Sequence, residues 1–245
     1  MIKKEYQEMI MEGLGVFALC FVGGWAVEWA IEGKQSVTAV ALAHGFVLGL
    51  FVFVAATISG GHLNPAVSFS LYATGYQKIE DTIRYVLAQC GGSLLAGLAL
   101  KLMRPKLFEA TIDAKQLGHP ALPDNVDTSI GFVCEAIATG TLVLCVMSAG
   151  IHKKSSEATV ATMVGASLLI GVLSIGNTTG AALNPARVFG PSFFSGRMVG
   201  RGALVYYFGP IVGGISSALL YKFFFMSDDE KKAVDNTLEK PFVDN

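Results

Sequence analysis

The sequence predicts an all-α membrane protein with six transmembrane helices and two half-length helices arranged as an inverted repeat. Three observations lead to this fold class. The chain of 245 residues is 52% apolar and only 15% charged, whereas a soluble domain is roughly 25% charged. Its apolar residues form long runs without a polar face, and two short apolar segments carry the same Asn-Pro-Ala tripeptide. A net charge of −1 gives no electrostatic basis for binding nucleic acid.

Six stretches are long enough to cross a membrane, because a bilayer core of about 30 Å needs roughly 20 apolar residues in a helix. The first stretch is too long for the apolar part of a signal peptide, so we expect it to be retained. The run over 37–58 contains no Asp, Glu, Lys or Arg, whereas soluble helices show a polar face with a period of about 3.6. The expected spans lie near 9–30, 37–58, 79–100, 129–150, 157–176 and 203–225.

Two further apolar segments are too short to span the bilayer. One follows the second span over 59–75, the other follows the fifth span over 177–194, and both are interrupted by Gly and by Asn-Pro. The helical part of the first, 65–73, would be about 14 Å long, or half of the bilayer core. The free backbone groups of such a helix need partners, so we expect each one to be buried by protein or to line a wet cavity.

An internal repeat relates the two halves of the chain. Matching residues lie 120 to 123 positions apart, so that 12–92 and 135–213 are two copies of one unit: span, span, half-helix, span. Because each copy holds three spans, the copies insert with opposite orientation, and inverted repeats with broken helices form solute pathways. The matched pairs are Gly45 and Gly165, Gly60 and Gly180, Asn64 and Asn184, Gly92 and Gly213, and Glu12 and Glu135.

The repeat also divides the chain into segments. We expect a cytoplasmic N-terminal segment over 1–8, a channel domain over 9–226 and a charged, flexible cytoplasmic tail over 227–245. Within the channel domain the first copy covers about 9–100 and the second about 129–226, with a linker over 101–128 between them. With both termini cytoplasmic, more Lys and Arg residues fall on the inner side than on the outer side. The pattern does not separate a vacuolar-type membrane from the plasma membrane.

Each Asn-Pro-Ala tripeptide suits the start of a helix at the membrane centre. Pro is favoured at the first helical position because its missing N–H would be unpaired there. Asn before it is a strong N-cap through its side-chain oxygen, which leaves the NH₂ group free to point into a lumen. Each half-helix N-terminus carries roughly +0.5 charge, so the constriction attracts the oxygen of water and repels cations and hydronium. The tripeptides are Asn64-Pro65-Ala66 and Asn184-Pro185-Ala186.

These features together resemble the aquaporin (major intrinsic protein) family. The matching pieces are SGGHLNPAV over 59–67, GAALNPAR over 180–187, Glu-Ala-Ile over 135–137 and Gly-Pro over 209–210. The resemblance covers about residues 8–226 and implies an aquaporin-like right-handed helix bundle. It implies a passive channel for water and small neutral solutes in the lipid bilayer, without enzymatic activity or a cofactor. The family usually assembles as homotetramers in which each protomer has its own pore.

Arg187 is the only ionised side chain in the run over 158–194. A charge at membrane depth is costly and is by default functional. It lies one helical turn outward from Asn184. A cation about 5 Å from it would experience roughly +3 kcal/mol at an effective dielectric constant of about 20, which excludes cations by about two decades. The alternative is an Arg that reaches to the outer interface or pairs with a Glu.

By resemblance, the narrow filter of the family has four positions, which here are His44, Val172, Ala181 and Arg187. Water-strict members typically have an aromatic residue at the first position and His at the second. This chain departs at both and looks more like the plant tonoplast (vacuolar) branch. Its smaller side chains predict a wider lumen that passes water and, as further solutes, ammonia, urea or hydrogen peroxide. We expect His44 to be neutral beside the guanidinium; otherwise it is a packed residue that hydrogen bonds between helices.

A facilitator of larger neutral solutes such as glycerol is the alternative within the family. Glycerol facilitators usually carry Asp directly after the second Asn-Pro-Ala-Arg and Lys soon after, where this chain has Val188 and Ser192. An ion-coupled carrier would need a buried titratable group such as Glu12 or Glu135. A structural or adhesion membrane protein with a residual pore is the third class. No nucleophile–base set supports an enzyme, and the four Cys lack the spacing of a metal site.

The sequence also predicts the surroundings of five further titratable residues. Glu12 and Glu135 are expected to accept backbone N–H groups of the loop before each half-helix. Glu28 has no partner in the second copy and is expected at the membrane interface. His62 lines the inner half of the pore by resemblance, or packs within its loop. His119 is either a solvated loop residue or folds over the outer mouth, as in some relatives with an extended filter.

Overall fold

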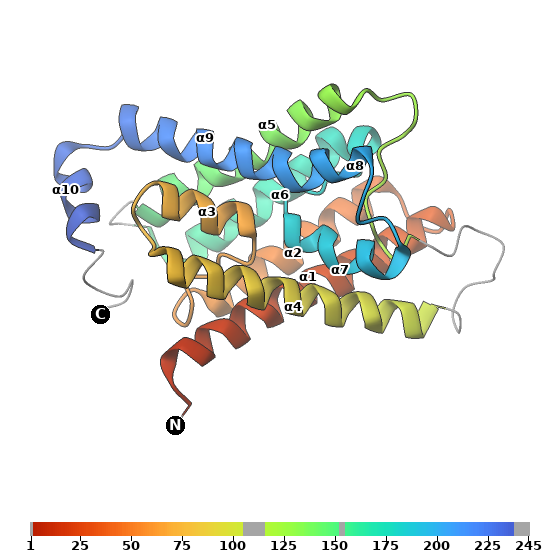
Figure 1. Cartoon of the computed structure of the whole chain (residues 1–245), viewed down its shortest axis with the longest axis horizontal. Coiled ribbons are helices and arrows are strands. Elements are labelled where there is room, and N and C mark those ends of the chain that lie inside the picture. The colour runs from red at the N-terminus through yellow and green to blue at the C-terminus, as the bar shows by residue number, and fades with distance from the viewer. Residues whose placement is uncertain (1, 105–115, 152–154, 238–245) are drawn as a thin grey trace.

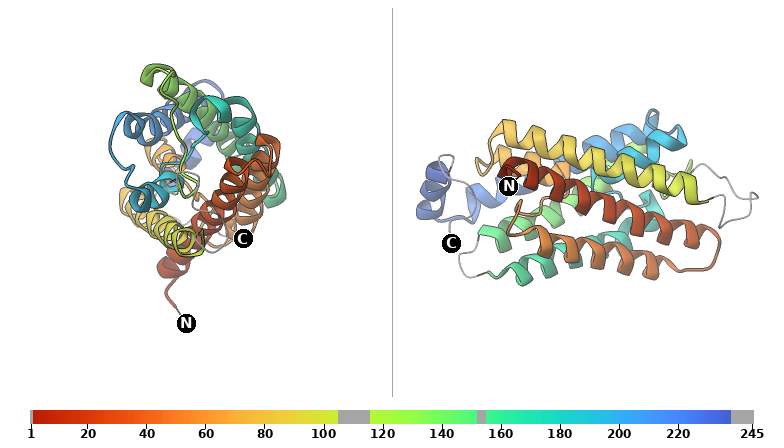
Figure 2. Two further views of the ribbon diagram at one scale, coloured as in Figure 1. Left: turned by 90° about the vertical axis from the view of Figure 1, so that its right-hand side faces the viewer. Right: turned by 90° about the horizontal axis from the view of Figure 1, so that it is seen from below.

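The computed structural model describes residues 2–104, 116–151 and 155–237, and over these residues every regular element is a helix. The long helices form an elongated bundle (Figure 1) and lie around the edge of the molecule when it is viewed from one end (Figure 2). In the first half they are α1 (Lys4–Ile31), α2 (Val37–Ala55) and α4 (Ile79–Met103). In the second half they are α5 (Thr128–Ile151), α6 (Glu157–Thr179) and α9 (Gly209–Phe224). The turns α8 (Arg201–Ala203) and η2 (Leu204–Phe208) precede α9.

Within the described residues, six helices are long and apolar enough to cross a membrane. This confirms the predicted spans, although α1 starts at Lys4 and the last span starts at Arg201, in each case before the predicted boundary. Large apolar side chains cover the outer surface, including Phe46 at 72% and Ile137 at 66% exposure. Such a surface suits lipid rather than water.

The half-helices are α3 (Pro65–Ala73) and α7 (Pro185–Ser195), which enter from opposite ends of the bundle (Figure 1). In each, the Pro of the tripeptide is the first helical residue and the Ala is the second. The helix α3 packs against α9 and α4, whereas α7 packs mainly against α4. The predicted inverted arrangement is present in the fold, because α3 and α7 enter from opposite ends of the bundle (Figure 1) and each packs on a helix of the other copy.

The two copies meet along α2 and α6, where glycines allow the backbones to approach. A Cβ on Gly45 would lie 2.8 Å from the carbonyl oxygen of Gly165. Within the copies, Gly92 and Gly213 have the same role, since a Cβ on either would lie 1.9 Å from a backbone oxygen of the neighbouring helix. These contacts agree with the close crossings that small residues permit between membrane helices.

The start of the tail differs from the expectation of a flexible segment. Residues Asp228–Thr237 form the helix α10. Its start is stabilised by a reciprocal cap: Glu230 accepts from the backbone N–H of Ser227 over 2.7 Å, and the Ser227 hydroxyl accepts from the Glu230 N–H over 3.3 Å. Residues 105–115 of the predicted linker and 238–245 of the predicted tail lie outside the described residues. The starts of α1 and α10 lie at the same end of the bundle (Figures 1 and 2).

Candidate functional site

The two asparagines that begin the half-helices hydrogen bond across the centre of the molecule. The Asn64 Nδ2 donates to the carbonyl oxygen of Leu183 over 2.9 Å. The Asn184 Nδ2 donates to the carbonyl oxygen of Leu63 over 2.8 Å. Each side-chain oxygen accepts the backbone N–H two residues ahead, at 2.9 and 3.0 Å, so both residues are N-caps. Each side-chain amide therefore uses one of its two N–H groups within the protein. One N–H remains for a solute, whereas the sequence predicted that the whole NH₂ group would be free.

The residues before each half-helix adopt a backbone that L side chains rarely take. Leu63 and Leu183 both have φ of +50°, and both are fully buried. A non-glycine residue held in this region costs on the order of 1–3 kcal/mol. The strained conformation turns the two carbonyl groups toward the opposite Asn. Something must therefore hold these segments in place.

Two buried carboxylates hold them. Glu12 accepts from the N–H groups of His62 and Leu63, at 3.0 and 2.7 Å, and from the hydroxyl of Ser59 at 2.7 Å. It also accepts from the amide of Gln89 at 2.7 Å.

Glu135 repeats the arrangement with Ala182, Leu183 and Thr179, at 2.9, 2.8 and 2.6 Å. Both carboxylates thus face the loops, which matches the expected support role. With every bond donated by the protein, neither is positioned as the substrate-facing group of a carrier.

His44 and Arg187 meet close to the two asparagines, on the side from which α7 enters the bundle. The His44 Nδ1 lies 2.8 Å from the carbonyl oxygen of Val40. Since a carbonyl only accepts, Nδ1 carries the proton and Nε2 is an acceptor. Arg187 donates to that Nε2 from Nε at 3.4 Å and from Nη2 at 3.2 Å. The hydrogen bonds therefore fit a neutral imidazole whose two nitrogens both serve the protein.

The third guanidinium nitrogen of Arg187 is different. Arg187 is only 4% exposed, and among the described residues its Nη1 has no hydrogen-bond partner. A buried donor without a partner is unfavourable unless water or a solute satisfies it.

The packing against α1 also fixes the imidazole of His44, because a Cβ on Gly23 would lie 2.3 Å from its Nε2.

The other two predicted filter residues lie in and directly after α6. Val172 is 3% exposed and Ala181 is fully buried, and both belong to the same buried apolar cluster. Ala181 has φ of +50°, where the first copy has Gly61 with φ of +66°. Neither side chain offers a polar group, so the side-chain polar atoms of the predicted filter come from His44 and Arg187.

The first copy carries a polar network that the second lacks. The His62 Nδ1 lies 3.1 Å from the Ser68 hydroxyl, and its ring meets the ring of Tyr85 at 5.0 Å between centroids. Gln89, which sequence reasoning missed, links Ser68 to Glu12. The repeat could have revealed it, because the matching positions in the second copy are apolar: Ala182, Val188 and Pro210.

Glu28 and His119 are both buried, which corrects the expectation for Glu28 and excludes one of the two alternatives for His119. Glu28 is 1% exposed rather than interfacial, and it is paired with the buried Arg104 at 2.5 Å. His119 is 6% exposed rather than solvated, and its ring meets that of Tyr206 edge-on at 5.8 Å. The partner of Glu28 could not be predicted, because Arg104 follows a different span. The burial of the short loop around His119 depends on packing between distant segments, which a pattern of apolar residues does not show.

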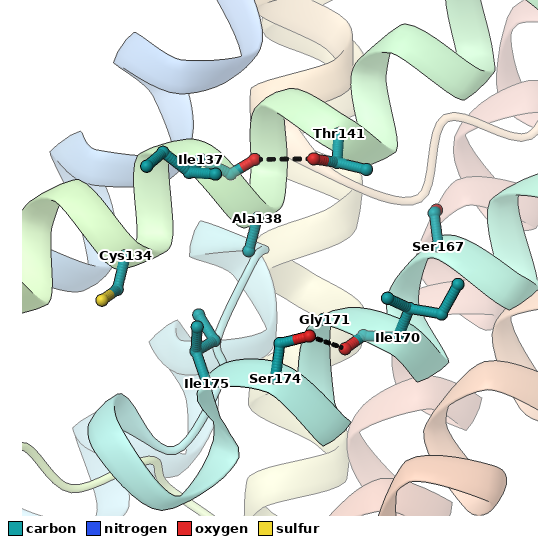
Figure 3. A pocket seen from close by; sticks show the side chains of 9 residues that line it. All are labelled: Cys134, Ile137, Ala138, Thr141, Ser167, Ile170, Gly171, Ser174 and Ile175. Carbon is teal, nitrogen blue, oxygen red and sulfur yellow. Dashed lines mark hydrogen bonds between the residues drawn. The ribbon is translucent and has the colours of Figure 1, made fainter.

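A cleft of about 190 Å³ lies between α5 and α6 (Figure 3). Its hydroxyl groups are already bonded to their own helices: Thr141 donates to the carbonyl of Ile137, and Ser174 to that of Ile170 (Figure 3). The cleft contains none of the predicted filter residues, and its polar atoms are satisfied. It is therefore separate from the site around the two asparagines. Among the described residues no cluster of His, Cys, Asp or Glu could hold a metal ion.

The family follows from comparison with known proteins. The family profile of the major intrinsic proteins (MIP) matches residues 2–221. This chain belongs to the major intrinsic protein family. Aquaporin-4 of Mus musculus is 30% identical over 223 residues, which cover 89% of this chain and 66% of that protein. Aquaporin-8 of Notomys alexis is 31% identical over 227 residues, with 92% and 84% covered. This major intrinsic protein thus spans about two thirds of the length of aquaporin-4.

The fold of this major intrinsic protein is also that of a solved relative. The X-ray structure of the aquaglyceroporin from Plasmodium falciparum superposes with a TM-score of 0.79 at 25% identity, covering 95% of this chain and 99% of that one. The predicted family and fold class are thereby confirmed, and the chain belongs with channels rather than enzymes. The comparisons lend no support to the plant tonoplast branch.

Proposed function

We propose that this protein is a passive channel for water that excludes ions and protons. The observation that carries the proposal is the reciprocal bonding of Asn64 and Asn184, which joins two helix N-termini head to head. Each N-terminus contributes roughly +0.5 charge, and each Asn retains one N–H. A water molecule passing this point turns its oxygen toward those donors. Its own hydrogens then point away along the path, which breaks a continuous proton chain.

Arg187 supplies the second barrier. Its charge at about 5 Å opposes a cation by roughly 3 kcal/mol at an effective dielectric constant of about 20. Two of its nitrogens are held by His44, and Nη1 is left to donate to a passing solute. A neutral solute with a carbonyl or hydroxyl oxygen satisfies that donor, whereas a cation does not.

The small side chains of Val172 and Ala181 complete the predicted filter. Because neither restricts the passage as a His or an aromatic ring would, we propose ammonia, urea and hydrogen peroxide as further solutes. His62 lies on the inner side of Asn64 and, in this proposal, lines the inner half of the path. The side chains of Glu12 and Glu135 support the two loops and do not contact the solute.

A facilitator of glycerol or similar solutes is the second candidate. The structural likeness to a protein described as an aquaglyceroporin favours it. The apolar Val188 and the small Ser192, which follow Arg187 in the sequence, count against it by family resemblance. The two candidates share one pathway and differ only in the width of the filter.

Stopped-flow light scattering on proteoliposomes distinguishes these candidates, with water, ammonia, urea and glycerol tested in turn. We expect water permeability well above that of protein-free liposomes, and glycerol permeability below that of urea. The double variant His44→Phe/Val172→His should reduce urea flux relative to water. Unchanged relative flux would remove the filter from the proposal. Negligible permeability to all four would instead favour a structural or adhesion protein, and flux that depends on a proton gradient would favour a carrier.

We also propose a homotetramer in the lipid bilayer with both termini cytoplasmic. The shared end of α1 and α10 supports placing the termini on one side (Figure 1), and the Lys and Arg distribution favours the inner side. Mass measurement in detergent tests the tetramer, and protease access to the tail in sealed vesicles tests the orientation.

A further inference from the structure

Glu28 joins three parts of the chain at the outer end of the bundle. It lies near the end of α1 and is 1% exposed. Its Oε2 accepts from the Nε of Arg104, which directly follows α4, over 2.5 Å. Its Oε1 accepts from the backbone N–H of Gly118 over 3.0 Å. One carboxylate thus ties two spans to the loop between α4 and α5.

The tied loop is buried over four consecutive residues, 117–120. Leu117 and Gly118 have φ of +49° and +74°. A Cβ on Gly118 would lie 2.4 Å from the Cα of Gly24, so the loop backbone rests directly on α1. Position 118 therefore requires Gly, because any other residue would be strained at this positive φ and its Cβ would clash with α1.

The far side of the same loop rests on the segment that carries the predicted filter. Pro120 lies 2.7 Å from where a Cβ on Gly180 would be, and Gly180 precedes Ala181. The ring of His119 packs edge-on against Tyr206, whose hydroxyl donates to the carbonyl oxygen of Thr179 over 2.6 Å. The loop is therefore held between α1 and the residues on either side of Gly180.

A buried ion pair adds little net stability, because desolvation of the charges offsets their attraction. Its directional hydrogen bonds nevertheless fix the position of what it binds. We propose that Glu28, held by Arg104, is a positioning residue for solute selectivity: its bond to Gly118 keeps residues 117–120 against the filter and so limits the size of neutral solutes. This inference rests on the proposed channel function and adds to it a specificity determinant outside the path itself.

Two double variants separate the hydrogen bond from the ion pair. Glu28→Gln/Arg104→Met and Glu28→Leu/Arg104→Met both remove the buried charges, but only the Gln variant keeps an oxygen that accepts from Gly118. The measured quantity is the ratio of urea to water permeability in proteoliposomes. We expect the Gln variant to keep the wild-type ratio and the Leu variant to raise it by about fivefold or more. Equal ratios in the two variants, whether raised or unchanged, would overturn the proposal.

A second pair moves the loop without touching the ion pair. Gly118→Ala places a methyl group against Gly24, whereas Gly33→Ala imposes the same positive-φ strain, at +69°, with nothing within 4 Å. We expect only Gly118→Ala to raise the ratio; a wild-type ratio in Gly118→Ala would contradict the inference. Failure of the proposed function is a separate result, since the wild-type protein would then give no water flux above protein-free liposomes.

Discussion

Asn64 and Asn184 hold the two half-helices together, because the amide of each donates to the carbonyl of the residue that precedes the other. The same side chains cap their own helices through the oxygen. One amide group therefore fixes the start of its helix, the distance to the opposite helix and the direction of the remaining N–H. The strained φ of Leu63 and Leu183 is what turns their carbonyls toward this contact.

The first prediction concerns the donor of each Asn. Asn184→Asp keeps the cap, since Asp is as good an N-cap as Asn, but it replaces the donor by an acceptor that faces the carbonyl of Leu63. We expect lower water permeability and a raised cation leak, together with a loss of about 2 kcal/mol of stability from the buried unpaired groups. Flux assays with a potential-sensitive dye and thermal unfolding in detergent measure these changes. Asn64→Asp should behave alike, and wild-type ion exclusion in both variants would contradict the role of the donors.

The second prediction separates the charge of Arg187 from its placement. Arg187→Val removes about 3 kcal/mol of repulsion toward a cation, so cation or proton leak should rise by roughly two decades. His44→Leu leaves the charge but removes the acceptor for Nε and Nη2, so neutral-solute ratios should change while ion exclusion persists. Ion leak and urea flux, measured in the same liposome preparation, test both. An equal rise of ion leak in the two variants would show that charge alone is not the barrier.

The elements of the fold were predictable because each rests on a local pattern. The length of each apolar run predicts a membrane span. The Asn-Pro pairs predict that α3 starts at Pro65 and α7 at Pro185. The repeat links Glu12 to Glu135, and their loop contacts follow from the need to satisfy backbone N–H groups at membrane depth.

Contacts between distant segments were not predictable. Nothing in the sequence shows that Arg104 reaches Glu28, since the two are 76 positions apart. The burial of His119 depends on the same long-range packing. The position of His44 was found by family resemblance, but its bonds to Val40 and Arg187 were not. They depend on which rotamer the crossing of α1 and α2 permits.

The third prediction concerns the C-terminal end of α3, which lies away from the two asparagines. Lys222 donates to the carbonyl oxygen of Thr74, at the C-terminal end of α3, over 2.8 Å, where a cation also favours the helix dipole. Lys222→Met should therefore lower the stability by about 1 kcal/mol and reduce water permeability as α3 loses its anchor. Lys101 is the matched control, because it occupies the corresponding position of the first copy but lies 5.5 Å from the centre of the Phe194 ring. A larger effect of Lys101→Met on the thermal midpoint would contradict the anchor.

The last prediction concerns acid sensitivity through the buried outer loop. Burial, with the charges of Arg187 and Arg197 nearby, lowers the pKa of His119 from 6.5 to about 3. Below pH 6.5 His119 binds a proton in the unfolded chain, whereas in the folded chain it stays neutral down to about pH 3. The stability of the fold therefore decreases as the pH falls from 6.5 to about 3. Between pH 7.5 and 4.5 the wild type should lose about 3 kcal/mol of stability relative to His119→Gln, because the glutamine side chain takes up no proton in either state. Thermal unfolding of the two detergent-solubilised proteins across this range measures the difference. The substitution also removes the contact with Tyr206, but that loss is the same at every pH and shifts the curve without changing its slope. Parallel curves would mean that His119 is protonated in the folded protein as readily as in water, and the loop would then not be packed as described.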